Sequence, residues 1–285
     1  GLAGALKRRL GCAVVCALQD EDTWVDAMRE DLARAVWAAM AERAADVDAF
    51  AAVSRWYAEA VRVRLGLAPE RLHVTPPGVD LEGHAAAPLP FDPPVVGFLS
   101  RLSRAEGFGL LVEAVARLKT DPRLRRLQLA ATGGSTGEDR RLVREARRRF
   151  ARLGAEADLI VHPEFDRAQR LRFLQSLTVL SVPVLRGDAC GLYLLEALAS
   201  GVPAVQPRLG AFPEVLEATG GGVLYAPNAV EPLAEALKSL LLNPAQARAL
   251  GARGREAVRR DYSAERAAER LLAVCRAALA RRRSA

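Results

Sequence analysis

The chain lacks any long run of apolar residues. None of its stretches approaches the roughly 18–20 apolar residues that a helix needs to span a membrane. The first 18 residues do not read as a signal peptide either, because Lys7, Arg8 and Arg9 interrupt them and no cleavage pattern follows. We therefore expect a cytoplasmic protein, and leave open only a weak contact with a membrane surface through Arg281-Arg282-Arg283.

Cysteine is scarce as well. The four cysteines (Cys12, Cys16, Cys190 and Cys275) include no C-x-x-C pair and match no zinc-ligand spacing. Neither a metal site nor a disulfide framework is therefore predicted. Cys12 and Cys16 lie in an apolar run, where we expect them to be small core residues.

Aromatic residues and lysines are also few. Only 15 residues (eight Phe, three Trp and four Tyr) are aromatic, and they do not alternate with basic residues as a base-stacking platform requires. The net charge is +7, but just three of the 41 basic residues are lysines, and arginine runs such as 147–149 fall on expected helix faces. Abundant Arg and Ala are typical of a GC-rich bacterial genome. We therefore predict no nucleic-acid partner.

What the chain does have is a regular alternation of expected strands and helices. Apolar runs predict buried strands, and segments with helical periodicity lie between them. The expected strands are 12–18, 48–54, 72–79, 95–99, 127–131, 158–162, 178–182, 203–206 and 222–225. The expected helices are 2–10, 26–46, 55–65 (after a Ser54 cap), 108–119, 138–152, 166–176, 191–199, 211–218, 230–242, 244–260 and 263–283. This order predicts an α/β protein with doubly wound parallel sheets.

The expected elements divide into two unequal lobes. The segment 87–94, at the end of a proline-rich stretch, is assigned as the linker. We assign residues 1–86 to a partial N-terminal Rossmann-like lobe, 95–260 to a complete Rossmann-like lobe and 261–285 to a C-terminal helix. The first lobe is about half the usual size of such a domain. This small size predicts a truncated chain, a fragmentary gene product or a natural variant with a shortened lobe.

Candidate binding residues follow the ends of the expected strands. Arg101, Gly133 and His162 each come just after a strand of the second lobe, where open α/β sheets bind their ligands. A helix is expected to start at Gly191, where free backbone N–H groups and the helix dipole favour an anion. The carboxylates of Asp188 and Glu196 lie before and within that helix. Together they predict a ligand with both phosphate and hydroxyl groups, such as a nucleotide-sugar.

These motifs resemble those of the retaining glycosyltransferases of family 4, which have the GT-B fold. Asp188 and Glu196 are similar to the two acids of that family's E-x7-E signature. The other motifs, in the same order as in the family, are Val53-Ser54 before a helix, Pro76-Pro77-Gly78-Val79-Asp80, Gly97-Phe98-Leu99-Ser100-Arg101-Leu102 and Gly210-Ala211-Phe212-Pro213-Glu214. The resemblance implies transfer of a sugar from a nucleotide-sugar to an unknown glycan, lipid or small-molecule acceptor. Configuration would be retained, and neither a metal nor another cofactor would take part.

The resemblance also implies roles for single residues. Arg101 would grip the diphosphate and Asp188 would contact the donor sugar, so these two are the expected catalytic residues. Glu196 would bind the ribose. The other expected donor-binding residues are Gly191, Leu192, Tyr193, Gly133, His162 and Glu214.

Structural interpretations of the same residues stay open. Arg101 could be a surface arginine and Asp188 a helix N-cap. Glu196 could be an exposed helix residue, although its apolar neighbours predict a half-buried acid with a partner. Gly133 could form an ordinary turn, His162 could simply end a strand, and Glu214 could cap a helix.

Departures from the family pattern favour an alternative function. Glu106 stands where the family has a lysine, and a carboxylate beside a diphosphate is repulsive. Gln19 stands where many members have a histidine, and it cannot do acid–base work. The alternative is a non-catalytic nucleotide-sugar-binding or interaction remnant of such an enzyme.

Two further alternatives have less support. An isomerase of the nucleotide-sugar 2-epimerase kind would need a catalytic histidine in the first lobe, and none precedes His73. Asp20-Glu21-Asp22 fits the D-x-D metal signature of a different glycosyltransferase fold, but nothing around it supports that fold.

Overall fold

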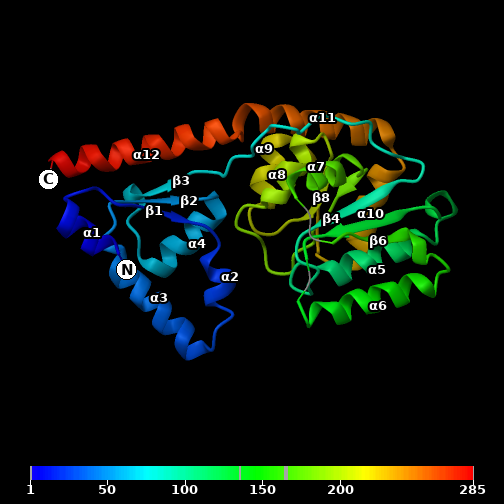
Figure 1. Cartoon of the computed structure of the whole chain (residues 1–285), viewed down its shortest axis with the longest axis horizontal. Helices are drawn as coiled ribbons and strands as arrows, with labels where there is room; N and C mark the ends of the chain where they lie inside the picture. Colours follow the sequence, from blue (N-terminus) through cyan, green and yellow to red (C-terminus); the bar gives the residue numbers. More distant parts are fainter. Residues whose placement is uncertain (1, 135, 164–165, 285) are drawn as a thin grey trace. The chain divides into compact units, whose positions relative to one another are not determined.

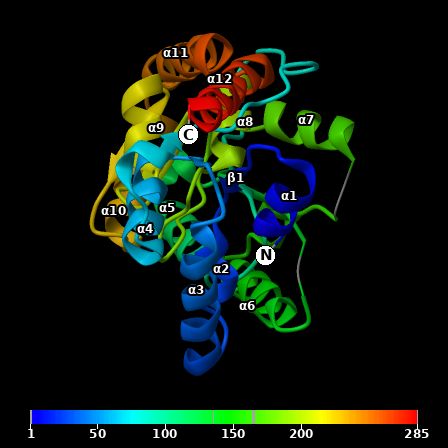
Figure 2. The ribbon, with the colours of Figure 1, turned by 90° about the vertical axis from the view of Figure 1, so that its left-hand side faces the viewer.

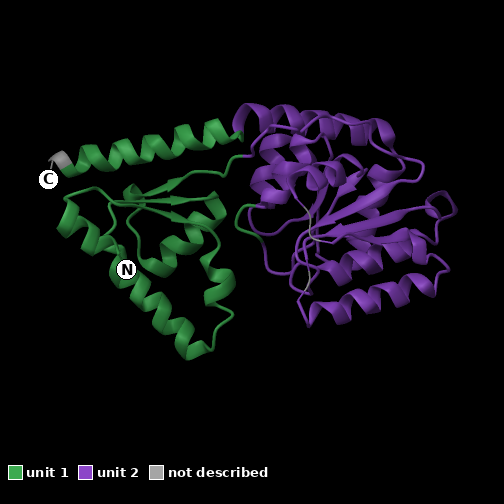
Figure 3. Cartoon of the chain, in the orientation of Figure 1, with its two compact units in different colours: residues 1–78, 188–190, 262–285 green, residues 79–187, 191–261 purple. Residues whose placement is uncertain are grey.

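The chain forms two compact units. The computed structural model describes residues 2–134, 136–163 and 166–284 (Figure 1). Unit 1 comprises residues 1–78, 188–190 and 262–285, and unit 2 comprises residues 79–187 and 191–261 (Figure 3).

Unit 1 is built on a parallel sheet of three strands in the order β1-β2-β3. The register pairs Val15 with Ala49 and Phe50 with Leu72. The strands are β1 (Val15–Leu18), β2 (Ala49–Ala52) and β3 (Leu72–Val74), and the helices are α1 (Ala3–Leu10), α2 (Glu21–Val25), α3 (Glu30–Ala44), α4 (Arg55–Leu65) and α12 (Ala264–Ser284). The prediction that Ser54 caps α4 is confirmed, because its Oγ accepts a hydrogen bond from the Tyr57 N–H at 3.0 Å.

The two faces of this sheet pack against different helices, because successive strand residues point to opposite sides. Phe50 and the half-buried Cys16 face the cluster formed with α3 and α4. Ala49 faces the other way and packs against Val274 and Ala278 of α12. Figures 1 and 2 show α12 beside this sheet, on the side away from α3. All four cysteines are free thiols.

Unit 2 is a doubly wound domain with a six-stranded parallel sheet in the order β6-β5-β4-β7-β8-β9. The strands are β4 (Val95–Leu99), β5 (Gln128–Thr132), β6 (Leu159–Val161), β7 (Val179–Leu180), β8 (Ala204–Pro207) and β9 (Gly222–Tyr225). The helices are α5 (Phe108–Leu118), α6 (Asp139–Ala151), α7 (Arg167–Gln175), α8 (Leu192–Ala199), α9 (Phe212–Thr219), α10 (Val230–Leu241) and α11 (Pro244–Asp261). The strand order reverses between β4 and β7, and such switch points are where these sheets bind ligands.

Helices cover both faces of the unit 2 sheet. In Figure 1, α5 and α6 lie below it, and α8, α9 and α11 lie above it. This explains why β4 is buried along its whole length and shows no alternation of apolar and polar residues. At the core, the rings of Phe98 and Phe108 pack edge to face with centroids 5.2 Å apart.

The helix predicted over residues 26–46 is confirmed as α3, which begins at Glu30 and ends at Ala44. A break at residues 26–29 separates it from the short helix α2, which was not predicted and ends at Val25. Within the break, Asp26 accepts hydrogen bonds from Trp37 Nε1 and from Arg64, each at 2.8 Å. These tertiary contacts hold the turn in place of helical hydrogen bonds.

The two compact units also differ from the assigned lobes. The expected linker, residues 87–94, lies inside unit 2, whereas α12 belongs to unit 1 together with residues 188–190. No helix of the described residues is both long enough and apolar enough to cross a bilayer.

Candidate functional site

The predicted site residues of unit 2 lie at one edge of its sheet. Arg101 follows β4, Gly133 follows β5 and His162 follows β6. Because the strands are parallel, their carboxyl ends share this edge, beside the switch between β4 and β7. The expected convergence of these three residues therefore follows from the topology.

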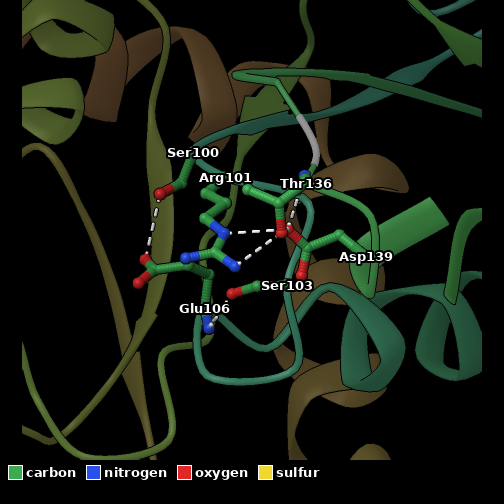
Figure 4. Close-up of polar contacts among 6 residues, drawn as sticks. All are labelled: Ser100, Arg101, Ser103, Glu106, Thr136 and Asp139. Atoms are coloured by element: carbon green, nitrogen blue, oxygen red, sulfur yellow. Dashed lines mark hydrogen bonds and ion pairs between the residues drawn. The ribbon is translucent and has the colours of Figure 1, made fainter. Parts of the chain in front are cut away.

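Arg101 is held by residues from the start of α6 (Figure 4). Its Nε donates to Asp139 Oδ2 at 2.8 Å and one terminal nitrogen donates to Thr136 Oγ1 at 2.9 Å. The Thr136 N–H and hydroxyl also donate to Asp139, both at 2.8 Å. Burial by itself would raise the pKa of Asp139, but the hydrogen bonds from Arg101 and Thr136 outweigh it and lower that pKa. The guanidinium is thus oriented from one side, and its side chain remains about half exposed.

A second acid, Glu106, flanks the same guanidinium. Its Oε2 accepts a hydrogen bond from the Ser100 hydroxyl at 2.9 Å, and its N–H donates to Ser103 Oγ at 3.3 Å. Figure 4 shows Arg101 between Glu106 and Asp139. The hydrogen bond to Asp139, with the charge of Glu106 adding to it, raises the pKa of Arg101. The carboxylates of Asp139 and Glu106 therefore both lie beside this one guanidinium.

Two glycines bring the loops at this edge into contact. Gly133 has a φ of +128°, and a Cβ on it would lie 2.2 Å from the carbonyl oxygen of Ser100. Gly107 has a φ of +77°, and a Cβ there would lie 1.9 Å from the carbonyl oxygen of Pro183. Only glycine fits either position without moving the backbone. Gly133 therefore has a packing reason to be glycine, whether or not it contacts a ligand. Ser135 lies outside the described residues.

The start of α8 offers backbone donors. Gly191 occupies the N-cap position with a φ of +62°. Leu192 and Tyr193 follow in the first turn. Asp188, which groups with unit 1, accepts a hydrogen bond from the Cys190 N–H at 2.9 Å. Asp188 is therefore not the N-cap residue itself.

Glu196 is a half-buried acid with a partner that the sequence did not reveal. Its Oε2 accepts a hydrogen bond at 2.5 Å from Arg170 of α7. Burial raises the pKa of Glu196, and the positive charges of Arg170 and Arg167 offset that effect only in part. The expectation that Glu196 has a partner is confirmed. The sequence could not identify this partner as Arg170, because the two residues are 26 positions apart in the chain.

The remaining predicted residues have ordinary structural contacts. The His162 N–H donates to the Ala131 carbonyl at 2.8 Å, and its ring packs edge to face on Phe173. Glu214 lies in the first turn of α9, where a carboxylate suits the helix dipole. The neighbouring position Glu164, which belongs to the same predicted segment as His162, lies outside the described residues.

The acidic segment after β1 forms a turn in unit 1. Both carboxylate oxygens of Glu21 accept from the Gln19 N–H, at 2.9 and 3.0 Å, and one also accepts from the Tyr57 hydroxyl at 2.5 Å. Thr23 Oγ1 donates to Asp20 at 2.7 Å. In the part of the chain that the structure describes, no three His, Cys, Asp or Glu side chains form a group that could hold a metal ion.

Family models match nearly the whole chain. The model described as Glycosyl transferases group 1 matches residues 82–257, and the model described as Glycosyltransferase Family 4 matches residues 1–82. The chain belongs to the glycosyl transferases group 1 family. This confirms the resemblance found in the sequence motifs, and the match over residues 82–257 contains every predicted site residue from Arg101 to Glu214.

Curated members of this family are similar over three quarters of the chain. The D-inositol 3-phosphate glycosyltransferase 1 of Catenulispora acidiphila is 32% identical over 225 residues, which is 75% of this chain and 53% of that protein. A D-inositol 3-phosphate glycosyltransferase of Acidothermus cellulolyticus is 32% identical over 231 residues, 77% of this chain and 51% of that protein. This member of the group 1 family thus spans about half the length of these relatives.

Solved structures of similar fold confirm the α/β architecture as GT-B-like. Sucrose-phosphate synthase from Thermosynechococcus elongatus matches with a TM-score of 0.80 and 23% identity, over 97% of this chain and 70% of that one. Anabaena Alr3699/HepE in complex with UDP and glucose matches with a TM-score of 0.78 and 19% identity, over 94% of this chain and 72% of that one.

Proposed function

We propose that this group 1 family member transfers a sugar from a nucleotide-sugar, with UDP as the nucleotide, to a hydroxyl acceptor with retention of configuration. The family match over residues 82–257 carries the proposal, because it spans the sheet edge where Arg101 and Glu196 lie. The choice of UDP rests on Anabaena Alr3699/HepE, which has been solved with UDP and with UDP-glucose. The comparisons do not favour the alternative of a non-catalytic remnant.

In this proposal the protein stabilises the departing diphosphate. Negative charge builds on the leaving phosphate oxygen as the bond to the sugar breaks, and the exposed side of the Arg101 guanidinium would neutralise part of it. The backbone N–H groups at Gly191, Leu192 and Tyr193 would add the positive end of α8. Asp188 would contact the donor sugar.

No nucleophilic side chain is required for such a transfer. By resemblance to the family, the leaving phosphate itself takes the proton of the acceptor hydroxyl on the face that the diphosphate has left. The new bond then forms on that same face, which gives retention. Glu196 would hold the ribose, His162 and Gly133 would line the nucleotide, and Glu214 would lie near the donor. The nucleotide-sugar is the substrate, and no cofactor or metal takes part.

Calorimetry with UDP, GDP and ADP tests the donor site. We expect micromolar binding of UDP to the wild-type chain and its loss in Arg101→Ala and Glu196→Ala. Arg140→Ala and Glu235→Ala are matched controls, because both side chains are exposed and neither forms a hydrogen bond or ion pair with a described residue. Absence of binding by all three nucleotides would refute the proposed donor site.

A second measurement tests the reaction itself. Incubation with UDP-glucose and candidate hydroxyl acceptors should release UDP, and NMR of the product should show the anomeric configuration of the donor. A product of opposite configuration would refute retention, and nucleotide binding without transfer or donor hydrolysis would favour the non-catalytic alternative.

A further inference from the structure

The contact between Arg170 and Glu196 joins two helices of unit 2. Arg170 comes from α7 and Glu196 from α8, and a terminal nitrogen of the guanidinium donates to Glu196 Oε2 at 2.5 Å. The Glu196 side chain is 16% exposed and that of Arg170 is 41% exposed. An unpaired carboxylate with so little access to water would tend to take up a proton, so this contact decides the state of Glu196.

Helix α7 is anchored firmly enough to hold Arg170 in place. Asp166 and Gln169 form a capping box at its start. Arg167, one turn before Arg170, pairs with the Asp80 carboxylate at 2.6 Å and donates to the Glu82 carbonyl at 2.8 Å. Arg167 thus ties the helix to Asp80 and Glu82, and Arg170 ties it to Glu196.

The pairing leaves one oxygen of Glu196 for a ligand. Arg170 binds Oε2 alone, and no described residue donates a hydrogen bond to Oε1. A carboxylate oxygen can accept about two hydrogen bonds, and the two neighbouring hydroxyls of a ribose are two donors. Oε1 therefore has the capacity that a ribose requires, provided that the carboxylate stays charged.

We propose that Arg170 is a positioning residue for the nucleotide, holding the Glu196 carboxylate charged and fixed so that Oε1 can accept hydrogen bonds from the ribose hydroxyls. This inference rests on the proposed function, in which Glu196 binds the ribose. It adds a residue for which neither the sequence motifs nor the family resemblance gave a role.

The charges around Glu196 support this role. Burial raises the pKa of Glu196, and the opposing charges come from Arg170 and, more weakly, Arg167, both on α7. His84 and Asp80 act on these same arginines from the segment before β4. Without Arg170, less positive charge opposes the effect of burial, so the pKa of Glu196 rises further and more of the carboxyl is in the protonated form, which accepts hydrogen bonds less well.

The test compares UDP with 2′-deoxy-UDP by calorimetry between pH 6 and pH 8. We expect the wild-type chain to prefer UDP by roughly tenfold, the typical effect of a hydrogen bond to a charged group. Arg170→Met should reduce that preference, and by more at pH 6 than at pH 8, because a higher pKa leaves more of Glu196 protonated at the lower pH. Arg170→Lys should restore the preference in part.

Two controls separate positioning from folding. Arg172→Met removes an exposed arginine of the same helix whose side chain has no hydrogen bond or ion pair with any described residue, and it should behave as wild type. In a Glu196→Gln background, Arg170→Met should have no further effect, because an amide needs no countercharge. Thermal unfolding of each variant shows that it is folded.

Three outcomes would overturn the inference. Tighter UDP binding by Arg170→Met would show that Arg170 competes with the ribose. An equal loss for UDP and 2′-deoxy-UDP at every pH would show a structural role only, and no change at all would show no role. If the wild-type chain binds none of UDP, GDP and ADP, the proposed function itself fails, and this inference fails with it.

Discussion

Glu106 is the residue whose charge most directly opposes a diphosphate at Arg101. Its carboxylate lies beside the guanidinium and accepts a hydrogen bond from Ser100 that a glutamine could also accept. We therefore predict that Glu106→Gln keeps the loop intact and strengthens UDP binding about fivefold, which corresponds to about 1 kcal/mol of repulsion removed. Calorimetry with UDP and with uridine checks this, because uridine carries no phosphate and should bind unchanged.

Glu235→Gln is the matched control for this substitution. Glu235 is an exposed acid of α10 that has no hydrogen bond or ion pair with the described residues, so it tests for a general effect of net charge. Equal strengthening in both variants, or equal strengthening of uridine and UDP, would contradict a local effect of Glu106.

The places of Arg101 and Glu196 in the fold could be predicted from the sequence, but the contacts that orient them could not. Arg101 follows a strand, and Glu196 interrupts an apolar helix, so both have a local signal. Their partners are Asp139, 38 positions from Arg101, and Arg170, 26 positions from Glu196. Both partners lie in charge-rich segments that look like solvated helix faces. Tertiary packing decides which of several arginines points into the protein, and helical periodicity in the sequence alone cannot predict it.

At the scale of elements, Lys119 ties the end of α5 to the start of β5 and to the segment before β6. Its Nζ donates to the carbonyl oxygens of Arg125 and Leu127 at 2.6 and 2.9 Å and pairs with Asp158 at 2.6 Å. The side chain is only 5% exposed. Lys119→Met would leave two carbonyls and a carboxylate without their donor.

We expect Lys119→Met to lower the free energy of unfolding by about 3 kcal/mol, the lower end for a broken buried pair, because Asp158 keeps some access to water. Urea unfolding followed by circular dichroism measures it. Arg152→Met, an exposed site just past α6, should change stability by less than about 0.5 kcal/mol. A loss below about 1 kcal/mol for Lys119→Met would mean that water replaces the three contacts.

The elements themselves were largely predictable, for reasons that the structure makes clear. Strands covered on both faces, such as β4, are uniformly apolar, and caps such as Ser54 mark helix starts. The start of α3 was predicted too early, at residue 26 instead of Glu30, because no Gly or Pro marks the break at residues 26–29. Asp26 binds Trp37 and Arg64 there, and those partners come from other parts of unit 1.

At the scale of the whole molecule, the path of the chain differs from a simple order of lobes. Helix α12 follows unit 2 in sequence but packs against the sheet of unit 1 through Val274 and Ala278. Its apolar face resembles that of α11, which packs within unit 2 against α8 and α9. An apolar helix face predicts burial but not the surface that buries it, so the sequence could not assign α12 to a unit.

The separate cores predict that unit 1 can be weakened while donor binding in unit 2 persists. Ala278 is fully buried against Ala49, and Ala278→Asp would place an unpaired carboxylate there, at a cost of about 3 kcal/mol or more. Ala277→Asp on the exposed face of α12 is the matched control. All three tryptophans of the chain lie in unit 1: Trp24, Trp37 and Trp56. Their fluorescence therefore reports on that unit, whereas UDP binding reports on unit 2.

Tryptophan fluorescence in urea should therefore show unit 1 of Ala278→Asp unfolding at a lower concentration than in wild type or Ala277→Asp. Calorimetry in the absence of urea should show UDP binding within about twofold of wild type, because Arg101, Glu196 and the start of α8 belong to unit 2. A loss of UDP binding that parallels the loss of unit 1 would contradict this. It would mean that UDP binding requires a folded unit 1.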